Sequence, residues 1–525
     1  MTTLREIACL FLALFAFAAC QGAEEAPRVY DIQISGGLVF DGMSDEGRLV
    51  DVILEKDKIV FVGDASNANV RGETVIDAAG LIVAPGFIDP HTHTTADVLF
   101  GTDSKALSGY LTQGVTTVVS GNDGGGPADV AGALRAVSER GVGPNFALFT
   151  GHGSIRGEVM GRDDRAPTQS ELAQMSDILR GALEAGALGL STGLYYAPAS
   201  YASTDEIVAL AKVAADFDAL YESHIRDESS YSIGLLGAVK EAIEIGRLSG
   251  AAVHIAHIKA LGVDVWGQSE AVIAAIETAQ AEGLRITADQ YPWSASGTRI
   301  SNALIPNWAK ADSDEAMFER LTAPDNKEQL RAEIAENLRR RGGSDAILLV
   351  ARANNAPSRT LTEEAVALEL DPIDAAIQIV LDGDARIASF NMQDQDIERF
   401  MRQPWVMTSS DGTNGHPRKY ASFPRKYRTY VVEKSVLPLA EFINRSTHLT
   451  AQTLQLCGRG SLRAGHFADI VVFNPDTFRQ IADFSNPAEL SVGVTHLFVN
   501  GAPAIQDGQI NPTLHGRPLR RANCS

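Results

Sequence analysis

Positive charge is scarce in this sequence. Its 525 residues include 45 Lys and Arg against 66 Asp and Glu, which gives a formal net charge of -21 at pH 7. Proteins that bind nucleic acid need clustered Lys and Arg to replace the counterions of the phosphates, so the composition argues against a nucleic-acid partner. A few local cations must then hold any anionic substrate. Hydrophobic residues make up 45% and charged residues 21% of the chain, as in an ordinary folded enzyme.

Long apolar runs are also scarce. The N-terminal run from Ala8 to Ala19 follows Arg5 and is too short to span a bilayer in a mature protein. It ends in Phe17-Ala18-Ala19-Cys20, which resembles a bacterial lipoprotein signal whose cysteine becomes the lipidated first residue. We therefore expect a signal peptide over 1–19 and a polar tether over 20–28. The exported protein would lie on the periplasmic side, held to the membrane only by a lipid on Cys20. Secretion by an ordinary signal peptidase is the alternative.

Cysteine is limited to four residues. Export would remove Cys9 and modify Cys20, which leaves Cys457 and Cys524. These two could pair outside the cytoplasm, although nothing in their spacing demands it.

Both ends of the chain show patterns typical of strands, and a different pattern lies between them. Residues 51–63 hold two short apolar runs joined by a polar turn, and the segments 468–473 and 496–501 are again short apolar runs of this kind. Between the ends, short apolar strands alternate with Ala-rich helical segments, which is the pattern of repeated βα units. The sequence therefore predicts an α/β protein with a (β/α)8 TIM-like barrel over 84–460. A small β-sandwich domain would be built from 29–83 and 461–521, and an insertion would separate the last two barrel strands at about 302–402.

Histidines and a carboxylate recur where the predicted barrel strands end. Gly86-Phe87-Ile88-Asp89-Pro90 leads into His91-Thr92-His93, and the two histidines can reach one metal ion because residues i and i+2 share one side of a strand. His224, His257 and Asp411 close three further strands, at the edge where parallel barrels place their chemistry. Imidazole together with carboxylate suits zinc or a similar divalent ion. The barrel strands are expected at 81–84, 116–120, 146–150, 188–191, 219–224, 252–257, 286–289 and 405–411.

Strand alternation sets His254 apart from these ligands. It lies three residues before His257, so it is expected on the opposite side of its strand, facing the helix layer. We therefore interpret His254 as a structural residue.

Cations follow the same strand ends. Arg226 and Lys259 each lie two residues after a predicted ligand, and Arg418 follows the last strand. Cations beside a positive metal ion make sense if the substrate is an anion. The alternative is that each cation pairs with a structural acid such as Glu222 or Glu228, and it stays open above all for Arg226.

Taken in order, these motifs resemble the N-acyl-D-amino-acid deacylase (D-aminoacylase) family of the metal-dependent amidohydrolase superfamily. The resemblance covers about residues 30–521. It implies hydrolysis of the amide bond of N-acyl-D-amino acids, which releases a carboxylate and a D-amino acid, and the preference for D over L rests entirely on it. The segments that carry it are 86–93, 114–122, 189–196, 221–226, 289–292, 410–412, 416–418 and 423–425.

The resemblance also implies the metal ligands. His91 and His93 would bind one ion, and His224 and His257 would bind another, held more tightly. Family members usually carry a metal-bridging cysteine after Gly-Asn, and here Asp123 stands in that position. We expect Asp123 to replace the cysteine, and the alternative is that it caps the loop that follows. One or two zinc ions are expected, with other divalent metals allowed.

Catalytic and substrate-binding roles follow from the same resemblance. Asp411 would act first as general base and then as general acid. Lys259, Tyr291 and Arg418 would hold the substrate carboxylate, and Tyr195 would also contact the N-acyl amino acid.

Other interpretations share parts of this pattern. A cyclic amidase of the hydantoinase or dihydroorotase kind usually bridges two metals with a modified lysine on the fourth strand, and residues 188–196 contain no lysine. A dipeptidase that acts on D-residues would use the same barrel. A binding lipoprotein with a degenerate site would be expected to lose Asp411 or a histidine, and none of them is missing.

Overall fold

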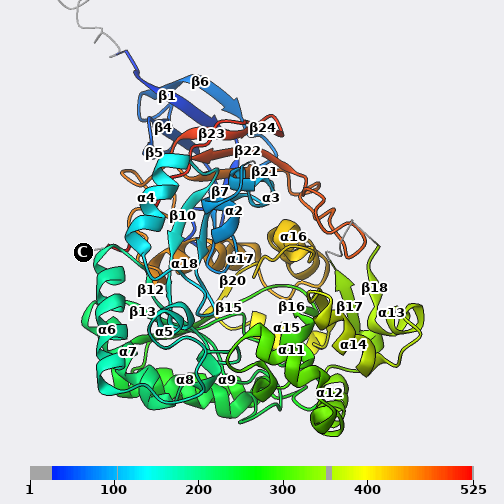
Figure 1. The fold of residues 1–525 in the computed structure, drawn as a ribbon. Helices are drawn as coiled ribbons and strands as arrows, with labels where there is room; N and C mark the ends of the chain where they lie inside the picture. Colours follow the sequence, from blue (N-terminus) through cyan, green and yellow to red (C-terminus); the bar gives the residue numbers. More distant parts are fainter. Residues whose placement is uncertain (1–25, 103, 351–356, 523–525) are drawn as a thin grey trace, which may run out of the picture.

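The computed structural model describes residues 26–102, 104–350 and 357–522. They form a barrel, a two-sheet domain made from both chain ends, and an inserted sheet with its own helices (Figure 1). The predicted (β/α)8 barrel with a β-sandwich domain and an insertion is thereby confirmed. In this described part of the chain, no helix is long and apolar enough to cross a membrane.

Several predictions about the chain ends concern residues beyond that range. The signal peptide over 1–19, Cys20 and Cys524 all lie outside the described residues. Cys457 is described and is disulfide-bonded. Export and lipid attachment stay predictions.

Eight strand positions form the barrel, and all of its ladders are parallel. One position is split into two short pieces, β10 and β11, on either side of Phe149. The barrel closes between its first and last strands, where Thr92 bridges Gly412 and Asp411 donates its backbone N–H to the carbonyl of His91 (2.9 Å). The strands are β8 (Phe87–Asp89), β9 (Val115–Ser120), β10 (Asn145–Leu148), β11 (Thr150–Gly151), β12 (Gly189–Gly193), β13 (Leu220–His224), β14 (Ala252–Ile255), β15 (Ile286–Gln290) and β20 (Val406–Thr408).

Helices with one apolar face surround the barrel (Figure 1). Polar side chains fix where they begin: Thr168 and Glu171 form a capping box at α6, and Ser203 caps α7. The main helices of this layer are α4 (Val130–Arg140), α5 (His152–Met160), α6 (Gln169–Glu184), α7 (Thr204–Asp216), α8 (Leu235–Ser249), α9 (Ser269–Ala281), α15 (Asp394–Met401), α16 (Arg418–Arg425), α17 (Leu439–Ser446) and α18 (His448–Thr453). Two shorter helices, α2 (Thr95–Leu99) and α3 (Ser108–Leu111), follow the first strand.

One strand that the sequence pattern placed in the barrel belongs to the sandwich instead. The run 81–84 forms most of β7 (Ile82–Pro85), which pairs antiparallel with β21 (Ile470–Phe473). The chain enters the barrel only after Gly86, where an added Cβ would lie 2.2 Å from Thr116 Cγ2, so only glycine permits this crossing. The prediction for 81–84 was wrong because a short, fully buried run looks the same in either kind of sheet.

Two sheets built from both chain ends enclose the core of the sandwich. The β1, β4, β5 and β6 strands lie beside β21 to β24 in Figure 1, although more than 390 residues separate the two groups in sequence. One sheet has the order β5 (Lys58–Gly63), β4 (Asp51–Glu55), β1 (Arg28–Ser35), β6 (Val70–Asp77). The other has the order β24 (Gln509–Ile510), β23 (Ala502–Gln506), β22 (Val494–Val499), β21, β7, β2 (Leu38–Val39), β3 (Arg48–Leu49).

The insertion is a four-stranded sheet with helices and a separate apolar core. It starts at β16 (Ala295–Arg299), before the predicted limit of 302, because the polar sequence of that strand gives no apolar signal. It ends with β19 (Arg386–Phe390), and the following α15 packs on the barrel helix α9 although the predicted insertion ran to 402. The other elements are β17 (Ile347–Val350), β18 (Arg359–Thr360), α10 (Ile300–Leu304), α11 (Asp314–Thr322), α12 (Lys327–Arg340), α13 (Leu361–Ala367) and α14 (Pro372–Leu381).

Candidate metal centre and substrate pocket

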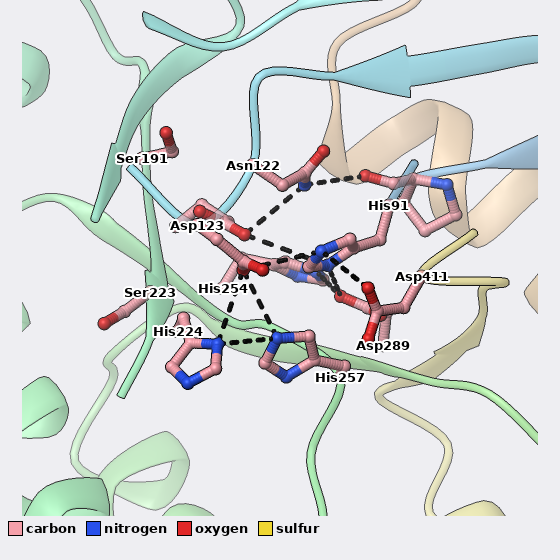
Figure 2. Close-up of polar contacts among 12 residues, drawn as sticks. His91, Asn122, Asp123, Ser191, Ser223, His224, His254, His257, Asp289 and Asp411 are labelled. Carbon is pink, nitrogen blue, oxygen red and sulfur yellow. Dashed lines mark hydrogen bonds and ion pairs between the residues drawn. The ribbon is translucent and has the colours of Figure 1, made fainter. Parts of the chain in front are cut away.

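Four histidines and two aspartates meet at the carboxyl end of the barrel. Figure 2 shows His91, His224, His257, Asp123 and Asp411 of this group. Each follows or ends a barrel strand, so side chains that are far apart in sequence converge at one edge. His91 and His93 follow β8, Asp123 follows β9, His224 ends β13, His257 follows β14, and Asp411 follows β20.

Asp123 lies at the centre of this group. Its Oδ1 is 3.3 Å from His257 Nε2, 3.4 Å from His91 Nε2 and 3.7 Å from His224 Nδ1. Its Oδ2 is 3.5 Å from His93 Nε2. One carboxylate therefore faces both histidine pairs, as a group that bridges two ions must.

The Asp123 backbone is held in an unusual conformation. Its φ is 56°, in the left-handed region that residues with a side chain rarely adopt, and His257 (33°) and Asp411 (48°) share that feature. A Cβ at Gly193 would lie 2.2 Å from the Asp123 carbonyl, so a side chain there would displace this loop. Such strain at three residues of one cluster is typical of a functional site.

The loop-cap interpretation of Asp123 finds no support in these contacts. In the described loop, Gly124 donates its N–H to Ser191 Oγ (3.2 Å) and Gly125 donates to the carbonyl of Asn122 (3.0 Å). The Asp123 carboxylate turns away from these amides, toward the histidines.

The donor set fits a divalent metal ion. Both ring nitrogens of His91 and the Oδ1 of Asp123 are buried without a hydrogen-bond partner, and buried polar atoms are normally satisfied. Two groups of ligand atoms, each within 4.8 Å of one another, share Asp123: one also contains His91, His93 and Asp411, and the other contains His224 and His257. Imidazole and carboxylate oxygen are the ligands that zinc, manganese and cobalt accept.

A second layer of carboxylates lies beneath these ligands, and the sequence reasoning missed it. Asp289 Oδ2 is 3.5 Å from His91 Nδ1 and 2.9 Å from His254 Nε2. Glu222 accepts from Asn122 (3.3 Å), and burial together with the nearby Asp123 raises the pKa of Glu222 to about 8. Because Glu222 lies two residues before His224 on one strand, strand alternation was a signal that could have revealed it.

His254 faces the barrel interior, and the prediction that it faces the helix layer was wrong. It contacts Thr287 (2.9 Å) and Asp289 from inside the barrel. The alternation argument failed because β14 ends at Ile255, and His257 lies beyond it in a loop with positive φ. His254 supports Asp289 and is not among the candidate metal ligands.

Asp411 is ionised in this site. Burial alone would raise its pKa, but Arg418, whose Nη1 lies 2.7 Å from Asp411 Oδ2, and His93 hold the pKa of that carboxyl well below its usual range. His93 Nε2 is 3.0 Å from Asp411 Oδ1. The carboxylate can therefore accept a proton while it stays next to the histidine cluster.

A cavity of about 290 Å³ opens beside the cluster. Tyr195, Lys259 and Tyr291 line it, as predicted for substrate-binding residues, but Arg418 is fully buried behind Asp411. The Lys259 ammonium is paired with Glu228 and also donates to His257 Nδ1 (2.8 Å). Both predicted carboxylate-binding cations thus already have an acidic partner.

Arg226 does not line this cavity. Its guanidinium pairs with Glu241 (2.9 Å) and donates to the carbonyls of Ser200 and Ala202. The structural alternative left open for Arg226 is therefore the one that the contacts support, with Glu241 as the acid.

Comparison with known proteins finds relatives along nearly the whole chain. An amidohydrolase family model matches residues 74–505. A D-aminoacylase from Alcaligenes xylosoxydans xylosoxydans is 32% identical over 94% of this chain and 98% of its own length. An N-acyl-D-glutamate deacylase from the same organism is 33% identical over 94% and 96%. The crystal structure of N-acyl-D-glutamate deacylase from Bordetella bronchiseptica, complexed with zinc and a phosphonate inhibitor, has a TM-score of 0.79 at 31% identity and covers 94% of this chain and 100% of that one.

Proposed function

This chain belongs to the amidohydrolase family, in its D-aminoacylase branch, and from that membership we propose that it is a metal-dependent hydrolase of N-acyl-D-amino acids. The reaction cleaves the linear amide bond and releases a carboxylate and a D-amino acid. The observation that carries the proposal is the Asp123 carboxylate between two histidine pairs, with Asp411 at the same site. A binding protein with a degenerate site would be expected to lack Asp411 or one of the histidines, and all of them are present.

The metal ligands are proposed residue by residue. His91 and His93 would hold one zinc ion, His224 and His257 would hold another, and Asp123, which belongs to both groups of ligand atoms, would be shared between the two sites. A bound divalent ion supplies a water molecule of lowered pKa and polarises the scissile carbonyl.

Asp411 carries the proton transfers. Its carboxylate accepts the proton of the attacking water and then delivers it to the nitrogen of the departing amine. Amines are poor leaving groups, so the second transfer is as necessary as the first. Arg418 keeps Asp411 ionised before the reaction and holds the carboxylate in place through its ion pair (2.7 Å).

The substrate lies in the cavity beside these groups. Its α-carboxylate contacts Lys259 and Tyr291, whose hydroxyl is buried and without a hydrogen-bond partner. Arg418 lies 4.8 Å from the centre of the Tyr291 ring and reinforces this end of the pocket with positive charge. Tyr195 forms part of the wall near the insertion, where its hydroxyl donates to the carbonyl of Asn302 (2.7 Å).

The test is an assay of the purified, metal-replete protein against matched pairs of N-acetyl-D- and N-acetyl-L-amino acids, with released amine measured. The proposal expects hydrolysis of D-substrates that the Asp411→Asn variant loses. A hydantoin, dihydroorotate and a dipeptide with a D-residue are included for the runner-up activities. Hydrolysis of any of these, with none of the N-acyl-D-amino acids cleaved, overturns the proposal.

Export with a lipid anchor is proposed separately. The apolar run 8–19 after Arg5, followed by Ala18-Ala19-Cys20, supports it. Membrane contact would then occur only through the lipid on Cys20. Cells that express the wild type or Cys20→Ser are labelled with a radioactive fatty acid and fractionated. Label in the wild type alone supports the anchor, whereas unlabelled, soluble wild-type protein contradicts it.

A further inference from the structure

The pocket wall contributed by the insertion carries positive charge that the proposed catalytic steps do not use. Arg341 and Arg386 line the cavity together with Arg299. Arg299 is half exposed and has a distant ion pair with Asp384 (3.9 Å). Within the described chain, neither Arg341 nor Arg386 forms an ion pair with a carboxylate, and the side chains that face the Arg341 guanidinium are those of Tyr195 and Tyr231.

Arg341 is the more informative of the two because it is buried. Its exposed fraction is 2%, and its Nε and Nη1 atoms have no hydrogen-bond partner. Four other arginines in the described chain are also buried, and each pairs with a carboxylate: Arg156 with Glu206, Arg418 with Asp411, Arg445 with Glu441, and Arg459 with Asp469. Arg341 alone of these five has no such partner.

Arg341 is also fixed in position. It directly follows α12, and the carbonyl of Arg340 accepts a hydrogen bond from the N–H of Val263, in the barrel loop after Lys259 (3.2 Å). Gly262 lets this approach occur, because a Cβ there would lie 2.3 Å from the Arg340 carbonyl. The Arg341 guanidinium lies 5.8 Å from the centre of the Tyr231 ring, another wall of the pocket.

An unpaired charge in such a place is costly. Burying a guanidinium without a counter-ion removes its hydration, and buried charges in proteins are normally paired. An arginine held this way, with donors left over at the edge of a cavity, is suited to an anion that arrives from outside.

We propose that Arg341, assisted by Arg386, binds a second carboxylate of the substrate, so that the preferred substrates are dianionic N-acyl-D-amino acids. This inference rests on the proposed function and adds the substrate class to it. The first carboxylate is the α-carboxylate at Lys259 and Tyr291. The second belongs either to an acidic side chain of the amino acid or to a dicarboxylic acyl group, which share the same chemistry at the guanidinium.

The experiment compares kcat/KM of the metal-replete enzyme within pairs of substrates that match in size and differ by one carboxylate. One arm uses N-acetyl-D-glutamate against N-acetyl-D-glutamine, and the other uses N-succinyl-D-alanine against N-butyryl-D-alanine. We expect the dianion to be preferred in one arm, which identifies the source of the second carboxylate. Arg341→Met should lower that preference by roughly 10- to 100-fold, the equivalent of one charge-assisted hydrogen bond of about 1.5–3 kcal/mol. The change should lie mainly in KM.

Controls separate charge at the pocket from effects on the fold. Arg339→Met changes an arginine in the last turn of α12, two residues before Arg341. Arg339 is half exposed and pairs with Asp264 (2.7 Å) and Glu336, so this variant should leave the preference intact. Arg341→Lys should keep part of it. If Arg341→Met does not fold, Arg386→Met reports on the same ratio.

Each outcome decides one of the two proposals. If monoanionic N-acyl-D-amino acids are hydrolysed at the same rates as the dianions, and these ratios do not change in the Arg341 or Arg386 variants, the second-carboxylate proposal is overturned and the proposed function still stands. Failure to hydrolyse any N-acyl-D-amino acid overturns the proposed function itself.

Discussion

The two ends of the substrate pocket handle charge in opposite ways. At the barrel end, Lys259 pairs with Glu228 and Arg418 pairs with Asp411 before any substrate arrives. At the end formed by the insertion, Arg341 is buried with no acidic partner in the described chain. The pocket cations of the barrel are therefore paired with acids of the barrel, whereas Arg341 of the insertion has no acidic partner.

This difference separates chemistry from recognition. Reacting groups must be held in one geometry, and ion pairs between neighbouring barrel loops do that without a ligand. A group that selects a substrate works best when its partner comes from the substrate, because an analogue that lacks the partner leaves it unpaired. Substitutions at the paired end, followed by substitutions of individual cations, can show whether the two ends divide these tasks in this way.

The largest effect is expected for Asp411→Asn. The amide cannot accept the proton of the attacking water, so kcat should fall by at least about 100-fold, the usual scale for losing acid–base catalysis. Metal content measured by mass spectrometry should stay close to that of the wild type, since the histidines and Asp123 remain. Near-normal turnover in a metal-replete variant would remove Asp411 from the mechanism.

Variants of Asp123 are tested by their metal content after chelation as well as by their rate of hydrolysis. Asp123→Ala should lose metal to a mild chelator at least about 10-fold more readily than the wild type. Removing a residue that only supports a ligand already lowers metal affinity by at least about 10-fold, and Asp123 is proposed to be a ligand itself. Asp123→Cys should hold zinc more tightly, since a thiolate is a softer ligand than a carboxylate. The wild-type protein, with its carboxylate, should also accept manganese or cobalt instead of zinc. An alanine variant that keeps both its metal and its rate would show that Asp123 is not a ligand.

The substrate α-carboxylate should matter less than these groups. N-acyl-D-amino-acid amides or esters should be about 10- to 100-fold poorer substrates than the free acids, because a charge-assisted hydrogen bond of about 1.5–3 kcal/mol is lost. A Lys259→Met variant should narrow the gap between acid and amide. Equal wild-type rates for acid and amide would assign Lys259 and Arg418 to structure alone.

Much of the fold could be predicted from the sequence because its periodic signals are local. Alternating strands and helices predicted the barrel, and histidines at strand ends predicted where a site would form. The strand β7 was misplaced because its sheet partner, β21, lies almost 400 residues away. The roles of the individual site residues stay predictions.

Some of the site could not be predicted because its geometry is not that of a regular strand. His257 lies beyond β14 with a φ of 33°, so alternation gave the wrong side for His254. Arg341 lies in the insertion, outside every motif that resembled the family, and only its burial without an acid marks it. Burial without an acidic partner depends on the tertiary structure, so the sequence pattern gives no signal for it.

Substitution of Arg226 is expected to have the smallest effect, and it tests whether this cation supports the fold or recognises the substrate. Sequence spacing left open whether Arg226 faces the substrate or pairs with a structural acid, and its contacts are with Glu241 and two backbone carbonyls. Arg226→Met should therefore lower stability, by about 1–2 kcal/mol for a partly buried pair, seen as a lower urea midpoint. Glu241→Gln should act in the same direction, and the double variant should lose less than the sum. The preference for free acid over amide should not change. A variant of normal stability that loses this preference would place Arg226 among the groups that recognise substrate.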